Sequence, residues 1–210
     1  MMQRNQLLGL LALCLLAAGG VYWGFFAPET GDWEEFFDVA DSWQLSSDAA
    51  AQVTIAEGQL HIHILQPGQV AWAAAERNFA DFDLRVEATQ LAGPENNEYG
   101  VLVRMDEDAH FYAFSISGDG YARISRYEEG RWVLLGPDWV SQPVIQLGAA
   151  TNVLAIKARG ATFTFLVNDT EVAQVVDETL SKGTIGLYAG AFEQPDVEIA
   201  FDNLQVLPAP

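Results

Sequence analysis

The sequence predicts an all-β domain built as a sandwich of two antiparallel sheets. Short segments alternate between apolar and polar residues with a period of two, and Gly- or Asp-containing turns separate them at near-regular intervals. No segment of convincing length shows the 3.6-residue period of an amphipathic helix. A chain of 210 residues holds one domain of this kind with a full core.

The clearest alternation lies in residues 98–127, where three predicted strands follow one another and the last begins after Gly118-Asp119-Gly120. Every second residue of these strands, Val101 and Val103 among them, is predicted to face the core, so Arg104 is predicted to point away from it. The predicted core set, taken over the whole domain, is Val101, Val103, Tyr112, Phe114, Ile124, Phe163, Phe165 and Phe201.

The other strands follow from the same pattern. Residues 33–43 predict an edge strand that runs into a loop, and residues 136–151 predict a long irregular connection. Tight turns are predicted at Glu57-Gly58 and at Asn168-Asp169. The remaining predicted strands are 52–56, 59–65, 69–75, 78–90, 131–135, 152–158, 161–168, 171–176, 183–190 and 196–206, which gives roughly a dozen in total.

Residues 1–26 form an apolar leader, predicted to be a helix, and residues 27–32 a linker ahead of the sandwich at 33–207. Residues 7–26 are long enough to span a bilayer and support an uncleaved signal anchor. Ala18-Gly19-Gly20 supports a cleaved signal peptide instead. Cys14 suggests a lipoprotein, but Leu13 does not suit that processing site. All three interpretations place the domain outside the cytoplasm.

Charge and cysteine content exclude some functions. The net charge is −19, which disfavours binding to nucleic acid or anionic lipid. The single cysteine lies in the leader, so the domain has no disulfide and no cysteine-based metal site.

Several segments in order resemble the concanavalin A-like lectin/glucanase superfamily, above all the bacterial 3-keto-disaccharide hydrolase and LamG-like envelope domains. The segments are Tyr99-Gly100-Val101-Leu102-Val103-Arg104, Phe111-Tyr112-Ala113-Phe114, Gly118-Asp119-Gly120-Tyr121, Gly183-Thr184-Ile185-Gly186-Leu187 and Phe201-Asp202-Asn203. The resemblance implies a jelly roll with one concave sheet that commonly binds glycans. It also implies a structural calcium ion at the sandwich edge, with Asp38, Asp41 and Asp202 as ligands.

A catalytic pair of carboxylates is not evident. Asp83 and Glu87 share a strand face, but a four-residue step separates them by roughly 13 Å, too far for glycoside hydrolysis. Arg85 between them would keep both ionised, so we interpret the three as a solvated charge ladder. His61 and His63 share a face but lack a third metal ligand, which favours a solvated pair.

The predicted binding surface uses basic, hydroxyl and aromatic side chains on the non-core faces of the strands. Arginine and histidine there suit sugar hydroxyls or a uronate carboxylate, and the alternative is that the arginines only pair with acids across the sheet. Trp139 is predicted to be exposed in the 136–151 connection and available for stacking on a sugar ring. The predicted ligand-binding residues are Arg104, Arg123, Arg85, His61, Ser115 and Trp139.

These patterns favour a membrane-tethered, extracytoplasmic module that binds glycan or cell-wall polymer. Two alternatives stay open: a glycoside-cleaving enzyme of the 3-keto-disaccharide hydrolase type, and a structural subunit that contacts partner proteins in a membrane complex.

Overall fold

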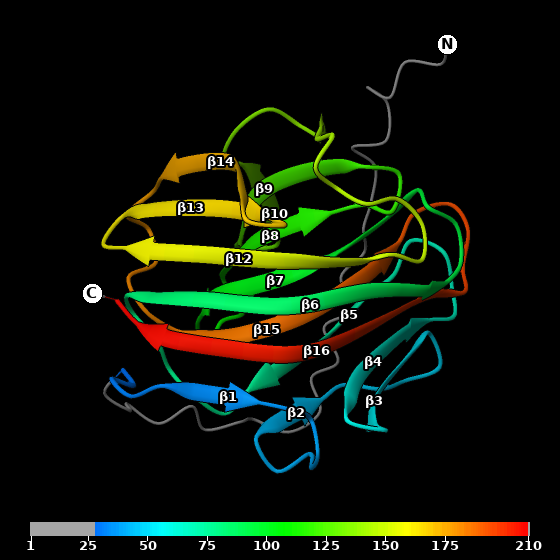
Figure 1. Ribbon diagram of the computed structural model, residues 1–210, viewed down its shortest axis with the longest axis horizontal. Coiled ribbons are helices and arrows are strands. Elements are labelled where there is room, and N and C mark those ends of the chain that lie inside the picture. The colour runs from blue at the N-terminus through cyan, green and yellow to red at the C-terminus, as the bar shows by residue number, and fades with distance from the viewer. Residues whose placement is uncertain (1–27, 210) are drawn as a thin grey trace.

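The computed structural model describes residues 28–209, which form sixteen strands in two antiparallel sheets packed face to face (Figure 1). Sheet A has the order β14 (Thr170–Val176), β13 (Thr162–Val167), β12 (Thr151–Arg159), β6 (Phe82–Ala92), β16 (Val197–Pro208), β4 (Gln59–Ile64) and β3 (Ala51–Ala56). The short strand β1 (Trp33–Glu35) pairs with β16 of the same sheet. The predicted all-β antiparallel sandwich is confirmed.

Sheet B lies behind sheet A in Figure 1. Its order is β10 (Arg131–Leu134), β9 (Tyr121–Glu128), β8 (Phe111–Ile116), β7 (Asn97–Met105), β15 (Thr184–Ala191), β5 (Val70–Ala75) and β2 (Trp43–Leu45). A further strand, β11 (Val140–Ser141), pairs with β9 inside the connection predicted to be irregular. Residues 33–43, predicted as one edge strand, instead contain β1 and the start of β2, which belong to different sheets.

The hairpins form where the sequence predicts tight turns. Glu57 and Gly58 connect β3 to β4 with φ of 55° and 75°, and Asn168 and Asp169 connect β13 to β14 with φ of 49° and 64°. Positive φ at both central residues is the geometry whose twist matches that of paired strands. The turns therefore set the register of both hairpins.

The core lies between the sheets and contains all eight residues of the predicted core set. Aromatic rings from the two sheets interlock there, since the Phe163 ring centroid lies 4.6 Å from that of Tyr112 and 5.7 Å from that of Phe114. Alternation fixes this face because successive side chains of a strand point to opposite sides.

The alternation fails at Arg104, and the prediction that this side chain points away from the core is wrong. Leu102 of β7 pairs with Gly186 of β15, and Met105 pairs with Thr184, so between these two pairs β7 has one residue more than β15. Arg104 lies in this bulge and takes a φ of 52°. The extra residue moves Met105 to the outer side of sheet B with Leu102. The Arg104 side chain is buried at the end of the sandwich and is 1% exposed.

Arg104 is fixed there by main-chain acceptors. Its Nε and Nη2 donate to the carbonyl oxygen of Ala80 at 3.1 and 2.9 Å, and Nη1 donates to that of Leu180 at 2.8 Å. Nη2 also contacts Asp81 Oδ1 at 3.1 Å, and the guanidinium carbon lies 4.6 Å from the centre of the Phe163 ring. The arginine therefore joins the segment before β6 to the connection between β14 and β15.

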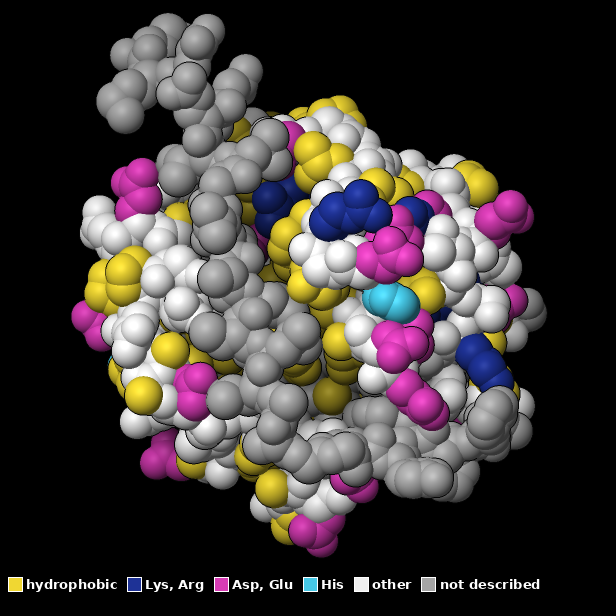
Figure 2. Space-filling model, turned by 180° about the vertical axis from the view of Figure 1, so that it is seen from behind, with side chains coloured by type: hydrophobic (Ala, Val, Ile, Leu, Met, Phe, Trp, Pro, Cys, Tyr) yellow, Lys and Arg dark blue, Asp and Glu magenta, His cyan; other side chains and the backbone are white. Residues whose placement is uncertain are grey.

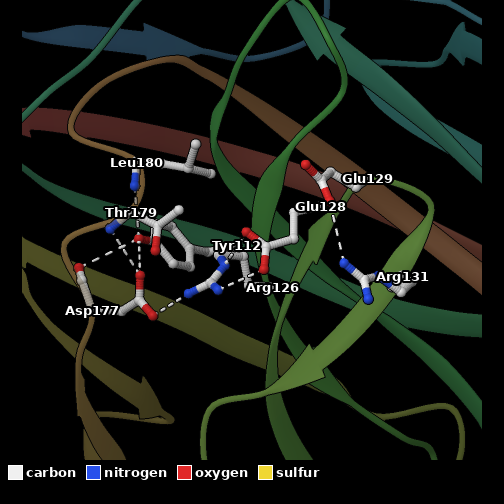
Figure 3. A network of polar contacts seen from close by, with 8 residues as sticks. All are labelled: Tyr112, Arg126, Glu128, Glu129, Arg131, Asp177, Thr179 and Leu180. Atoms are coloured by element: carbon white, nitrogen blue, oxygen red, sulfur yellow. Dashed lines mark hydrogen bonds and ion pairs between the residues drawn. The ribbon is translucent and has the colours of Figure 1, made fainter.

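A second polar cluster holds the same connection from the other side (Figure 3). Asp177 accepts hydrogen bonds from the Tyr112 hydroxyl at 2.6 Å and from the main chain of Thr179 at 3.0 Å, and it pairs with Arg126. The Tyr112 hydroxyl accepts a bond from the Leu180 main-chain N–H at 3.0 Å. Burial and the hydrogen bond to Asp177 raise the pKa of Tyr112 to about 12.

The predicted leader at 1–26 and the first residue of the 27–32 linker lie outside the described residues. Within residues 28–209, no helix is long and apolar enough to cross a bilayer.

Candidate functional site

The candidate site is the outer face of sheet B, which we call the concave face. Figure 2 looks onto it from behind the view of Figure 1 and shows hydrophobic side chains gathered in its hollowed middle, with acidic and basic side chains around them. Alternation along β7, β8, β9 and β15 places on this face every second side chain that does not enter the core.

An aromatic cluster occupies one part of this face. Phe111 and Tyr127 are register partners on β8 and β9, and their rings stack with centroids 5.3 Å apart. Trp132 on β10 pairs with Tyr127, and its ring centroid lies 5.1 Å from that of Tyr127 and 5.7 Å from that of Phe111. Trp72 on β5 extends the cluster, with its centroid 6.5 Å from that of Phe111.

A charged group occupies another part of the face. Arg123 Nη2 donates to Glu98 Oε2 at 2.6 Å, and Arg123 Nη1 lies 3.6 Å from Asp138 Oδ1. The guanidinium carbon of Arg123 lies 4.5 Å from the centre of the Trp139 ring, a cation–π geometry. Phe192 supports Trp139 edge-on, with ring centroids 6.0 Å apart. Residues of β7, β9 and the connection after β10 thus hold the Arg123 guanidinium between two carboxylates and an indole ring.

Small residues lie between the two groups. Gly100 on β7 pairs with Ser115 on β8 and with Tyr188 on β15, whose hydroxyl hydrogen-bonds Ser115 Oγ. Glu98 pairs with Gly190, where an added Cβ would lie 2.9 Å from Glu98 Cγ. The glycine therefore makes room for the Glu98 side chain against the sheet.

Four buried polar atoms on this face have no hydrogen-bond partner among the described residues: Glu98 Oε1, Arg123 Nε, Ser125 Oγ and Trp132 Nε1. They come from β7, β9 and β10 and lie on the same side of the sheet. A buried polar atom without a partner destabilises the fold by about 1–3 kcal/mol, so such atoms are rare unless function requires them. Donors and acceptors are both present, which suits a ligand rich in hydroxyl groups.

Two pKa values on this face are displaced by burial. Burial raises the pKa of Glu98, and the charge of Arg123 opposes the shift. Burial and the nearby Glu98 charge raise the pKa of the Tyr188 hydroxyl, which therefore stays protonated as a hydrogen-bond donor.

Arg104, predicted to bind ligand on the concave face, is instead buried and bonded to main-chain carbonyls, and the other five predicted binding residues separate into two groups. Ser115, Arg123 and Trp139 come together on the concave face, although Trp139 is half-buried rather than exposed. Arg85 and His61 lie on β6 and β4 of sheet A, so the prediction that they share a surface with Arg123 is wrong.

The residues on the outer face of sheet A pair with acids. Arg85 Nη1 lies 2.5 Å from Asp169 Oδ1, and His61 Nδ1 lies 3.4 Å from Glu198 Oε1. Asp83 pairs with Arg159 at 2.9 Å, in keeping with a surface charge ladder rather than a catalytic pair. Within residues 28–209, no group of three or more His, Cys, Asp or Glu side chains could hold a metal ion, so Asp38, Asp41 and Asp202 do not converge as predicted.

Sequence reasoning did not single out five residues that complete the site: Glu98, Asp138, Ser125, Phe111 and Tyr127. The sequence contained part of this information. Alternation places Glu98 on the same face of its strand as Gly100, and Tyr127 on the same face of its strand as Arg123. The pairing of β9 with β10, which brings Trp132 beside Tyr127, requires the fold.

Residues 32–207 match the model of one protein family, described as the 3-keto-alpha-glucoside-1,2-lyase-like domain. No curated protein matches the chain.

Solved structures share the fold. A carbohydrate-binding module CBM66 from Bacillus subtilis aligns with a TM-score of 0.64 and 17% identity over 78% of this chain and 93% of that one. A prokaryotic beta-1,3-1,4-glucanase from a mouse hindgut metagenome aligns with a TM-score of 0.67 and 13% identity over 85% and 100%. The Bacillus licheniformis beta-glucanase aligns with a TM-score of 0.65 and 10% identity over 86% and 99%.

Proposed function

Because this chain belongs to the family of 3-keto-alpha-glucoside-1,2-lyase-like domains, we propose that it binds carbohydrate on the concave face of sheet B. The observation that carries the proposal is the set of four buried polar atoms without partners on that face. Similar folds whose names include a carbohydrate-binding module and two glucanases support it.

The face offers both kinds of contact that a sugar ring requires. The half-buried ring of Trp132, which packs on the buried rings of Phe111 and Tyr127, presents aromatic surface for the apolar C–H side of a sugar ring. Ser125 Oγ and Trp132 Nε1 lie beside that surface with hydrogen-bonding capacity left for hydroxyl groups. A ligand of a few sugar units would reach from the aromatic cluster to the Glu98–Arg123 pair.

A binding assay with the full-length protein tests the proposal. A panel of α- and β-linked glucan, galactan and cell-wall oligosaccharides is titrated by calorimetry against the wild type and Trp132→Ala. Loss of a central aromatic contact weakens binding by about 2 kcal/mol, or about thirtyfold. The matched control is Arg85→Ala on the opposite sheet, which leaves the affinity unchanged. No binding to any member of the panel, or equal loss in both variants, contradicts the proposal.

A second candidate is glycoside cleavage, and the observation that favours it is the raised pKa of Glu98 on the same face. A carboxyl group with a raised pKa can hold a proton for a departing glycosidic oxygen. Incubation with ordinary and 3-keto disaccharides, followed by chromatography of the products, tests it. Turnover that Glu98→Gln abolishes supports catalysis, and an intact substrate with every disaccharide argues against it.

We propose further that the apolar leader places this domain at the cell envelope, outside the cytoplasm. The support is the run of apolar residues 7–26, preceded by Arg4 and followed by Glu29 and Asp32. Fractionation of cells tests it: the chain is expected with the membranes and open to protease added to spheroplasts. Recovery in the cytosolic fraction contradicts it.

A further inference from the structure

The Glu98–Arg123 ion pair leaves one buried donor and one buried acceptor without a hydrogen bond. A bidentate arginine–carboxylate pair makes two parallel N–H···O bonds. Here Arg123 Nη2 donates to Glu98 Oε2 at 2.6 Å, while Arg123 Nε and Glu98 Oε1 are buried and have no partner in the described part of the chain. Both atoms are buried, and Glu98 is 1% exposed, so bulk water does not satisfy either of them.

A hydroxyl group has the hydrogen-bonding capacity that matches these two atoms, because one oxygen can accept from Arg123 Nε and donate its proton to Glu98 Oε1. An ionised carboxylate can only accept, so it satisfies Arg123 Nε and leaves Glu98 Oε1 unpaired. The unused atoms therefore match a sugar hydroxyl and do not match a uronate.

The rest of the Arg123 environment leads to the same result. Its Nη1 lies 3.6 Å from Asp138 Oδ1, and the Trp139 ring covers one face of the guanidinium at 4.5 Å. Two carboxylates around one guanidinium give the group a net charge of −1 when both are ionised. A second anion at this position therefore meets electrostatic repulsion from the group.

Resting on the carbohydrate site proposed above, we propose that Glu98 and Arg123 select neutral sugars by holding one ring hydroxyl between Glu98 Oε1 and Arg123 Nε. The same pair discriminates against uronic acids and other anionic sugars. Of the two groups predicted to bind the arginines, a sugar hydroxyl and a uronate carboxylate, the proposal selects the hydroxyl.

The experiment compares the oligosaccharides that bind the full-length protein with the same oligosaccharides oxidised at C6 to uronic acids. Calorimetry is expected to show affinity about tenfold or more weaker for the oxidised form, as repulsion at close range predicts. Glu98→Gln removes one negative charge and supplies an amide donor, so the oxidised form gains affinity and the difference shrinks to about threefold or less.

Two further variants make the result decisive. Glu171→Gln makes the same change of charge on exposed β14 of sheet A and leaves the difference at its wild-type value. Asp138→Asn removes a negative charge at the rim of the site and is expected to narrow the difference in affinity between the neutral and the oxidised form. This variant tests the inference if Glu98→Gln does not fold. Equal or tighter binding of the oxidised form by the wild type overturns the inference and leaves the carbohydrate site standing. Failure of both forms to bind overturns the site as well.

Discussion

Replacement of Arg104 by alanine should destabilise the protein without altering ligand recognition. The change removes four hydrogen bonds from a side chain that is 1% exposed. The carbonyl oxygens of Ala80 and Leu180 lose these donors, and each buried acceptor left unpaired loses about 1–3 kcal/mol. The Phe163 ring also loses its cation–π partner. Two such acceptors, together with the lost contact on Phe163, lower the free energy of unfolding by about 3–5 kcal/mol.

For a domain of this size, each kcal/mol corresponds to a change of about 2–4 °C in Tm, so Arg104→Ala should melt about 6–20 °C below the wild type. Arg104→Lys keeps the charge but loses the planar fork, and it should recover only part of this difference. The free energy of unfolding is measured by urea denaturation followed by tryptophan fluorescence, and Tm by circular dichroism.

The matched control is Arg85→Ala, in which an exposed arginine of the other sheet loses a single ion pair with Asp169. Surface pairs contribute about 0–1 kcal/mol, so this variant should unfold close to the wild type. A loss below about 1 kcal/mol in Arg104→Ala would refute the assignment of Arg104 as a buried structural residue. A large loss of glycan affinity in the folded variant would refute its separation from the concave face.

Three other outcomes follow from contacts in the fold. Burial alone would raise the pKa of Asp177, but the hydrogen bonds it accepts and the charge of Arg126 outweigh burial and lower it. Stability from Asp177 is therefore present above its unfolded pKa of about 3.9 and lost as pH falls through the lower folded value, and Asp177→Asn should flatten this acid dependence in urea titrations. Gly190→Ala should displace Glu98 and weaken oligosaccharide binding several-fold in calorimetry, whereas unchanged binding would show that the pocket tolerates the added Cβ. Asn152→Ala should lower the free energy of unfolding by about 2–3 kcal/mol in urea, because both polar ends of this buried amide bond the neighbouring loop.

The sequence predicts the strands and the core well because both depend on local rules. Side chains alternate along any regular strand, so Val101 and Phe114 could be assigned to the core without knowledge of their partners. The Asn168-Asp169 turn likewise adopts the geometry that its residue types favour. The family resemblance, predicted from ordered motifs, agrees with the family match over residues 32–207.

The site was predicted only in part, because its assembly depends on pairing between distant segments. The chain crosses from sheet A to sheet B between β6 and β7, so Arg85 and Arg123 lie on opposite sides of the molecule despite equivalent places in their strands. The bulge that buries Arg104 arises from a mismatch between β7 and β15, which are far apart in sequence. Glu98 could be assigned to a strand face, but its unpaired oxygen depends on the position of Arg123.

The pairing of β1 with β16 has a consequence for how this domain can be connected. Trp33 and Val206 are register partners in an antiparallel ladder, so the first and last strands meet as the two arms of a hairpin would. A turn of about two to five residues would join them. A circularly permuted chain, closed at this corner and reopened at the exposed turn of Glu129 and Gly130, would keep every strand pair of both sheets. Because the two ends of the domain lie side by side, the whole sandwich could also be inserted into a surface loop of another protein without forcing the ends of that loop far apart.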